Sequence, residues 1–155
     1  MGTLISIEQS AFAEWVRVSA VGYPLMITSH AIGMGVMVGL TLAFCVRLLG
    51  WWQEISYSAL NRFWGIAWAG FGLNFVSGTA LFTTQATSYV ESVPFLLKLA
   101  LIFVGVVTAA LLQAAVTRDA DGWGSSAPAG IKALALVSVA SWTCAVVSGR
   151  LIAYY

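Results

Sequence analysis

Four long apolar segments dominate this sequence and restrict the folds that are open to it. They cover about residues 23–49, 65–84, 94–116 and 131–153. Each is close to the ~20 residues that an α-helix needs to cross the hydrocarbon core of a bilayer. Backbone groups in lipid must be paired internally, and these segments lack the alternation of barrel strands, so we expect helices. The chain therefore predicts an all-α bundle of four transmembrane helices, formed as a single membrane domain over residues 1–155.

The low charge content supports a membrane protein and excludes several function classes. Only 8% of the 155 residues are charged, whereas 60% are hydrophobic. Soluble domains carry roughly 25% charged residues, so this chain cannot cover a water-facing surface. A formal net charge of +1 without a basic cluster gives no basis for nucleic-acid binding. Hydrolase and nucleotide-binding motifs are absent from the sequence, which favours a protein that performs no bond chemistry itself.

Residues 5–20 mix charged and apolar side chains and therefore differ from the four segments. Phe12, Trp15, Val16 and Ala20 recur at the spacing of one helix face. An amphipathic helix of this kind lies in the plane of the membrane interface. We therefore expect an interfacial helix over about residues 5–20 that leads into the first span.

The basic residues of the connections predict the orientation of the bundle. Cytoplasmic loops carry an excess of Lys and Arg. The side of the membrane with the connections after the first and third segments carries Arg47, Arg62, Arg118 and Lys132, whereas the opposite side carries Arg17. We therefore expect both termini on the outer side of the membrane.

Three ionisable residues interrupt the apolar segments at a similar depth. His30, Lys98 and Arg150 lie in the first, third and fourth segments. At 1.5 Å per residue, they lie roughly 10, 6 and 7 Å below the outer surface. Ionisable groups inside a bilayer cost ~2.5–3.5 kcal/mol each on insertion scales, so a convergent set of them predicts a functional site.

An imidazole beside two cations suits an anionic cofactor, and haem b has the required chemistry. His30 would be the axial iron ligand, and Lys98 and Arg150 would pair with the propionates. The small residues Ser29 and Gly33 would let the flat ring approach the first helix. Because the chain has one histidine, the sixth iron position would be open or filled by another span, a partner or a second copy. The simpler alternative is that both cations reach lipid headgroups and the imidazole bonds a neighbouring helix.

Sulfur-containing residues of the first segment support a copper-handling or copper-transport protein as an alternative. Met26, His30 and Met34 recur every four residues. Met37 and Cys45 continue this stripe along the helix. Thioether, imidazole and thiol groups are ligands of Cu(I), although a Met stripe at helical spacing also serves core packing.

Polar residues of the second segment suggest a further contact and a further pocket. We expect Asn74, near the middle of the span, to hydrogen-bond across helices. Ser77, Thr79 and Thr83 lie nearer the outer layer and would line a quinone pocket. A third interpretation has no cofactor at all, with small-residue helix faces that anchor larger partners.

Short motifs along most of the chain resemble an uncharacterised family of bacterial four-span membrane proteins. They are Tyr23-Pro24 followed by His30, VRLLG at 46–50, WAGF at 68–71, LKLA at 97–100 and GRLIAY at 149–154. That family is similar in architecture to the copper-resistance D proteins and to four-helix membrane cytochromes b. The resemblance implies haem or copper, and electron transfer at the periplasmic face of the bacterial inner (cytoplasmic) membrane. The chain departs from cytochromes b in lacking their further histidines.

The leading prediction combines these observations. The chain would be a haem-b-binding subunit that passes electrons between a periplasmic redox protein and the quinone pool. It would work as a homo-oligomer or within a larger redox complex, with both termini in the periplasm.

Overall fold

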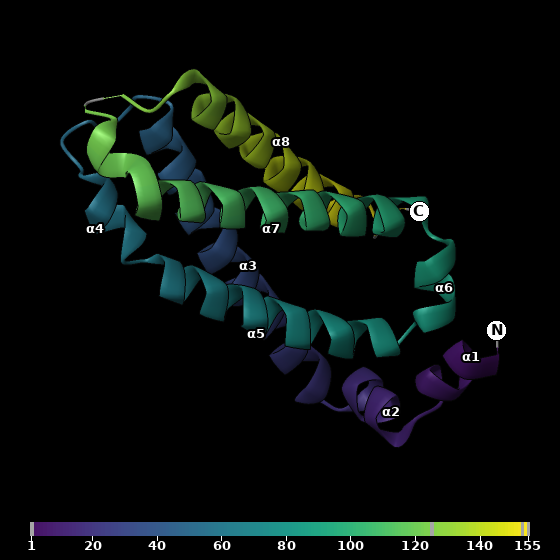
Figure 1. Cartoon of the computed structure of the whole chain (residues 1–155). Helices are drawn as coiled ribbons and strands as arrows, with labels where there is room; N and C mark the ends of the chain where they lie inside the picture. The colour runs from purple at the N-terminus through teal and green to yellow at the C-terminus, as the bar shows by residue number, and fades with distance from the viewer. Residues whose placement is uncertain (1, 125, 153, 155) are drawn as a thin grey trace.

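The computed structural model describes residues 2–124, 126–152 and 154, which form helices and connections without any strand (Figure 1). The elements are α1 (Gly2–Glu8), α2 (Ala11–Val18), α3 (Gly22–Leu48), α4 (Tyr57–Asn61), α5 (Trp64–Thr83), α6 (Ala86–Glu91), α7 (Val93–Asp119), the 3-10 helix η1 (Ala120–Gly122) and α8 (Ala129–Leu151). Within the described residues, four helical segments, built on α3, α5, α7 and α8, are long and apolar enough to cross a membrane. The predicted all-α bundle of a multi-pass membrane protein is confirmed.

The bounds of the long helices agree closely with the apolar segments. The largest difference is at the end of α7, which continues to Asp119 instead of ending near residue 116. Arg118 in its last turn complements the negative end of the helix dipole, which favours this extension. The sequence predicts the last segment over 131–153, whereas α8 begins earlier, at Ala129; Ala153 lies outside the described residues.

The amphipathic segment is divided into two helices instead of one helix over 5–20. Ser10 has extended backbone angles, and its Oγ accepts a hydrogen bond from the Ala13 amide at 3.2 Å. A serine N-cap of this kind begins a new helix, so α1 ends at Glu8 and α2 starts at Ala11. The turn into α3 is tight, because a Cβ at Gly22 would lie 2.7 Å from the Trp15 carbonyl oxygen.

The four long helices form two packed pairs. α3 lies along α5, α7 lies along α8, and the pairs meet mainly through α3 and α8. Glycines permit the close contact between α3 and α5. A Cβ at Gly33 would lie 2.6 Å from both the Gly70 carbonyl oxygen and the backbone nitrogen of Asn74. Close approach through small residues is typical of membrane helices. Trp68 on α5 also donates its indole N–H to Gln113 on α7 at 2.7 Å.

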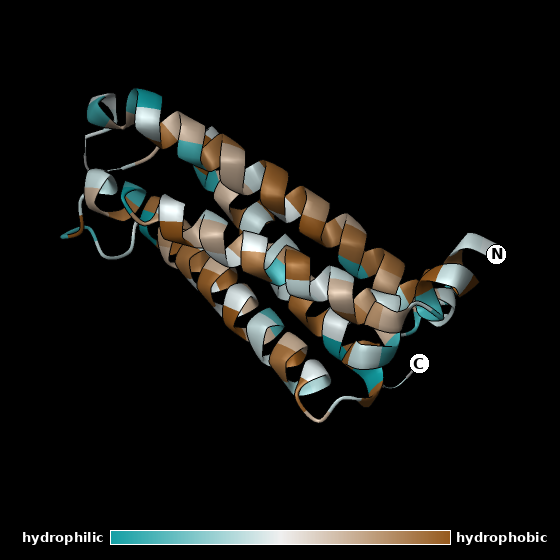
Figure 2. Ribbon diagram, turned by 90° about the horizontal axis from the view of Figure 1, so that it is seen from below, coloured by the Kyte–Doolittle hydropathy of each residue, from teal (hydrophilic) through white to brown (hydrophobic). Residues whose placement is uncertain are grey.

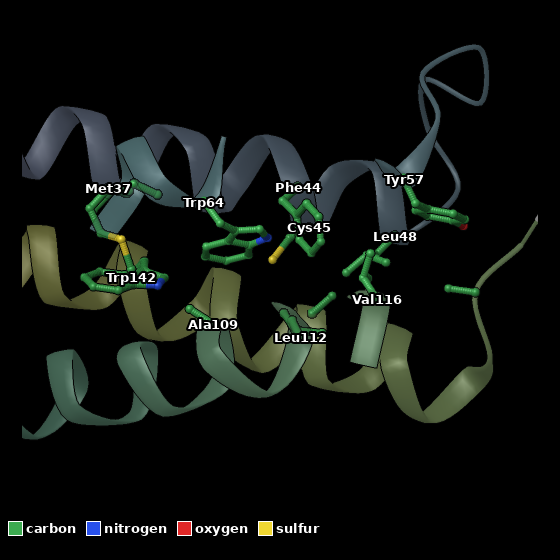
Figure 3. Close-up of a cluster of buried hydrophobic side chains, with 14 residues drawn as sticks. Met37, Phe44, Cys45, Leu48, Tyr57, Trp64, Ala109, Leu112, Val116 and Trp142 are labelled. Atoms are coloured by element: carbon green, nitrogen blue, oxygen red, sulfur yellow. The ribbon is translucent and has the colours of Figure 1, made fainter. Parts of the chain in front are cut away.

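The buried core follows the seam between the two pairs (Figure 3). Its large members include Met37, Phe44, Leu48, Trp64, Leu112 and Trp142. Hydrophobic residues, brown in Figure 2, are frequent along the long helices, and many of them are exposed on the outside of the bundle. Ile32, Phe75, Phe103 and Val147, one from each long helix, are more than half exposed. A bilayer, and not water, suits such a surface.

A buried arginine holds the connection between α3 and α4 at the end of the bundle remote from the termini. Arg47, only 4% exposed, donates Nε to the Ile55 carbonyl at 2.6 Å and Nη1 to the Tyr57 hydroxyl at 3.2 Å. Its guanidinium lies 4.1 Å from the centroid of the Tyr57 ring, a cation–π distance. Trp123 packs edge-on against the same ring, so Arg47 organises this end of the fold.

Candidate functional site

A cavity of about 220 Å³ lies at the end of the bundle where the chain begins and ends. We call it the terminal cavity. Its walls come from α3, α5, α6, α7 and α8. A recess of about 20 Å³ continues it toward the membrane centre and shares His30, Met34 and Lys98 with it.

The terminal cavity brings together the three ionisable residues of the apolar segments. His30 comes from α3, Lys98 from α7 and Arg150 from α8. No Asp or Glu is among its described lining residues. The one ion pair within the described residues, between Arg118 and Asp119, lies at the other end of α7. Among the residues that the structure describes, the cavity is therefore a cationic site with no carboxylate in its lining.

The imidazole of His30 is oriented by a hydrogen bond to α5. Its Nδ1 lies 3.0 Å from the Asn74 carbonyl oxygen. Because a carbonyl oxygen can only accept, Nδ1 carries the proton and Nε2 of the neutral ring keeps a lone pair. Metal-binding histidines are commonly oriented by this same contact.

Asn74 completes a reciprocal connection between α3 and α5. Its side-chain Nδ2 donates to the His30 carbonyl oxygen at 2.8 Å, which confirms the expected bond across helices. Ser77 lies beside the ring, with Oγ 3.4 Å from Nδ1, but its stronger bond goes to the Leu73 carbonyl at 2.6 Å. The two helices thus fix both the position and the tautomer of His30.

Gly78 provides the space into which the imidazole fits, a role that the sequence did not reveal. A Cβ at this position would lie 2.9 Å from Cε1 and 3.1 Å from Nδ1 of His30. Real Cβ atoms do not approach this closely, so any larger residue must displace the ring. The available signal was a glycine one helical turn after Asn74, and glycines are too frequent in membrane helices to single it out.

Three aromatic rings form one wall of the terminal cavity. Phe82, Tyr89 and Phe95 come from α5, α6 and α7, and their centroids are 5.2–6.2 Å apart. Their planes differ by only 16–24°. The three rings therefore stack on one another and give the cavity a largely apolar, aromatic wall.

The two cations lie near the start of α7 and the end of α8, respectively. The Lys98 side chain lies along Gly149, where a Cβ would be 3.4 Å from Nζ. Ser148 donates its hydroxyl to the Pro94 carbonyl at 2.6 Å and so joins the end of α8 to the first turn of α7. Arg150, two residues later, is exposed at the cavity mouth.

Some residues expected near a haem ring do not contribute to the cavity. Ser29 is not among its lining residues. Gly33 faces α5, where its missing side chain permits helix contact instead of ligand approach. Their positions reflect the rotation of α3, which turns this face toward α5.

The copper and quinone sets are not assembled either. Met34 lines the cavity, but Met26 does not, and Cys45 lies fully buried in the core. The described residues contain no group of three His, Cys, Asp or Glu placed to hold a metal ion. The hydroxyls of Thr79 and Thr83 donate to carbonyls of their own helix and do not face the cavity.

Comparisons with models of protein families, with curated proteins and with solved structures find no match for this chain. The fold and the cavity define its class: a four-span membrane protein with a cationic, aromatic-walled cavity near one face.

Proposed function

We propose that the protein is a haem-b-binding membrane subunit for electron transfer. One observation supports this most strongly: His30 has its Nδ1 bonded to Asn74, leaving Nε2 as a potential ligand in a cavity shared with Lys98 and Arg150. A neutral imidazole is a common axial ligand of haem iron. Two cations, with no carboxylate among the described lining residues, suit the two propionates of the same cofactor.

Different residues of the chain would bind different parts of the cofactor. His30 would hold the iron, with Asn74 keeping the ring in one tautomer. Lys98 and Arg150 would neutralise the propionates, and the aromatic wall that contains Tyr89 would supply apolar contacts and exclude water. Bound haem b would supply one-electron transfer; the protein would set its position and surroundings.

The size of the terminal cavity limits how haem b would bind. Sites that enclose a drug-sized ligand have volumes of roughly 300–1,000 Å³, and haem is large among such ligands. The terminal cavity, at about 220 Å³, is smaller. The cofactor would therefore project beyond the cavity mouth, or part of the wall would move to admit it.

The setting of this subunit is part of the proposal. It would lie in a bacterial inner membrane with both termini in the periplasm, as the basic residues of its connections favour. A cavity near one face supports exchange with a periplasmic redox protein and with the quinone pool. With one histidine per chain, the sixth iron position would be open or filled by another span, a partner or a second copy.

Absorption spectra of the purified protein, oxidised and then reduced with dithionite, test the proposal. We expect a Soret band that shifts on reduction, is lost in His30→Ala and is kept in the control Met26→Leu, whose position does not line the cavity. A protein with intact His30 and no Soret band refutes it. Metal analysis then separates the remaining alternatives, because bound copper favours a copper-handling protein and no metal favours a structural anchor.

A further inference from the structure

The short helix α6 contributes Tyr89 to the lining of the terminal cavity at the end of the bundle. It connects the end of α5 to the start of α7, and Figure 1 shows it beside α1. Its Tyr89 forms part of the aromatic wall and stacks on Phe95 with centroids 5.2 Å apart. A movement of α6 would therefore change the size of the cavity directly.

The helix α6 depends on other elements for its position. It has only six residues, and its N-cap residue Gln85 makes no side-chain capping bond. Helices this short are not stable without outside contacts. Its most extensive contacts are with α1, ahead of those with α7 and α5.

Two charged side chains of the N-terminal segment hold the connection that contains α6. The Glu8 carboxylate accepts hydrogen bonds from the Thr87 amide at 3.2 Å and the Thr87 hydroxyl at 2.6 Å. It thereby caps a free N–H of the first turn of α6, where a negative charge is favourable. Arg17 on α2 donates Nη1 to the Thr84 carbonyl at 3.2 Å, just before α6.

We propose that α6 is a lid over the terminal cavity and that α1 and α2 hold it closed through Glu8 and Arg17. Release of these contacts lets Tyr89 move away from Phe95 and widens a cavity that is too small for a large planar ligand when closed. The inference rests on the proposed function only in treating the cavity as a ligand site. The motion itself belongs to the ligand-free protein.

Access to a cysteine inside the cavity tests the lid. Met34→Cys places a thiol on the cavity wall, and Cys144→Ser removes the native cysteine that is exposed on α8. In this background the ligand-free protein is labelled with a charged methanethiosulfonate reagent. We expect Glu8→Ala to speed labelling severalfold, because a larger fraction of molecules has the lid open.

Glu14→Ala is the matched control, because Glu14 is an exposed acid of α2 whose side chain makes no hydrogen bond within the described residues. We expect Glu14→Ala to be labelled at the same rate as the Met34→Cys, Cys144→Ser protein. We expect the double variant Glu8→Ala, Arg17→Ala to be labelled faster than Glu8→Ala alone. Equal rates for Glu8→Ala and Glu14→Ala overturn the lid.

A second variant guards against a general loss of structure in Glu8→Ala. Thr87→Val keeps the branched shape of the side chain and removes its hydroxyl donor, so we expect faster hydrogen exchange confined to the amides of α6. Exchange that rises throughout α3 and α5 as well, or nowhere, contradicts the proposal. Both measurements use protein without cofactor, so the absence of a Soret band leaves their outcome valid. Haem binding with unchanged labelling rejects the lid alone.

Discussion

Substitution of Gly78 by alanine should displace the His30 imidazole directly. The new Cβ would lie 2.9 Å from Cε1 of the imidazole, and the ring must move away from it. That movement lengthens the 3.0 Å bond from Nδ1 to the Asn74 carbonyl. Overpacking costs ~1–3 kcal/mol and a lost hydrogen bond about 1 kcal/mol, while alanine gains about 1 kcal/mol of helix propensity. We expect a net destabilisation of about 2 kcal/mol.

The tautomer of His30 provides an assay that general instability would not mimic. Because the chain has one histidine, ¹⁵N-histidine labelling gives an NMR spectrum of this residue alone, provided that the purification tag lacks histidine. At about pH 8, where a free imidazole is neutral, we expect Nδ1 to be protonated and Nε2 to be bare in the wild type. In Gly78→Ala we expect a mixture of tautomers, because the bond that selects one of them is weakened.

Gly72→Ala is the control, since a Cβ at Gly72 meets nothing within 4 Å. It should keep the wild-type tautomer and, if anything, raise the melting temperature. A wild-type spectrum with the proton on Nε2 would refute the assigned orientation. A Gly78→Ala spectrum identical to that of the wild type would show that the ring does not depend on this gap.

Two further predictions concern the ends of the bundle. Hydrogen bonds from Thr87, aided by the charge of Arg17, lower the pKa of Glu8, so its contribution to closing α6 is complete above the pKa of a free glutamate, about 4.3. That contribution is lost as the pH falls through the lower pKa of the folded state. We therefore expect the α6 amide exchange rate of the wild type, divided by that of Glu8→Ala, to rise toward unity at low pH. A ratio that stays constant with pH contradicts this. At the other end, Arg47→Lys removes the Nε bond to Ile55 and should cost about 1.5–3 kcal/mol. Thermal unfolding checks this, with the exposed Arg62→Lys as the control.

Much of the fold could be predicted because membrane helices obey a length rule. An apolar run of ~20 residues has few alternatives to a spanning helix. The common depth of His30, Lys98 and Arg150 followed from the rise per residue alone, and the structure places the three residues around one cavity. The depth of a residue along a helix can be calculated without knowing which helices pack beside it.

The rotation of each helix could not be predicted in this way. Residues four apart differ by about 40° around the helix axis, so Met26 and Met34 lie about 80° apart although both seemed to follow one stripe. Only Met34 reaches the cavity. Gly33 was expected to face a ligand, but the packing partner α5 decides which way it points. The aromatic wall was missed because its three rings come from three separate elements.

The way the cavity joins the two helix pairs has a thermodynamic consequence. His30 belongs to the pair α3 and α5, whereas Lys98 and Arg150 belong to the pair α7 and α8. The pairs meet mainly through α3 and α8. A ligand held by all three residues would join the two pairs further, because it would bridge His30 on one side and Lys98 and Arg150 on the other. Lys98 and Arg150 lie on one side of this seam, and His30 lies on the other. An anionic ligand that bound all three residues only in the folded protein would stabilise the folded state in proportion to the logarithm of its concentration over its dissociation constant. The site and the stability of the bundle are therefore coupled through the same three side chains.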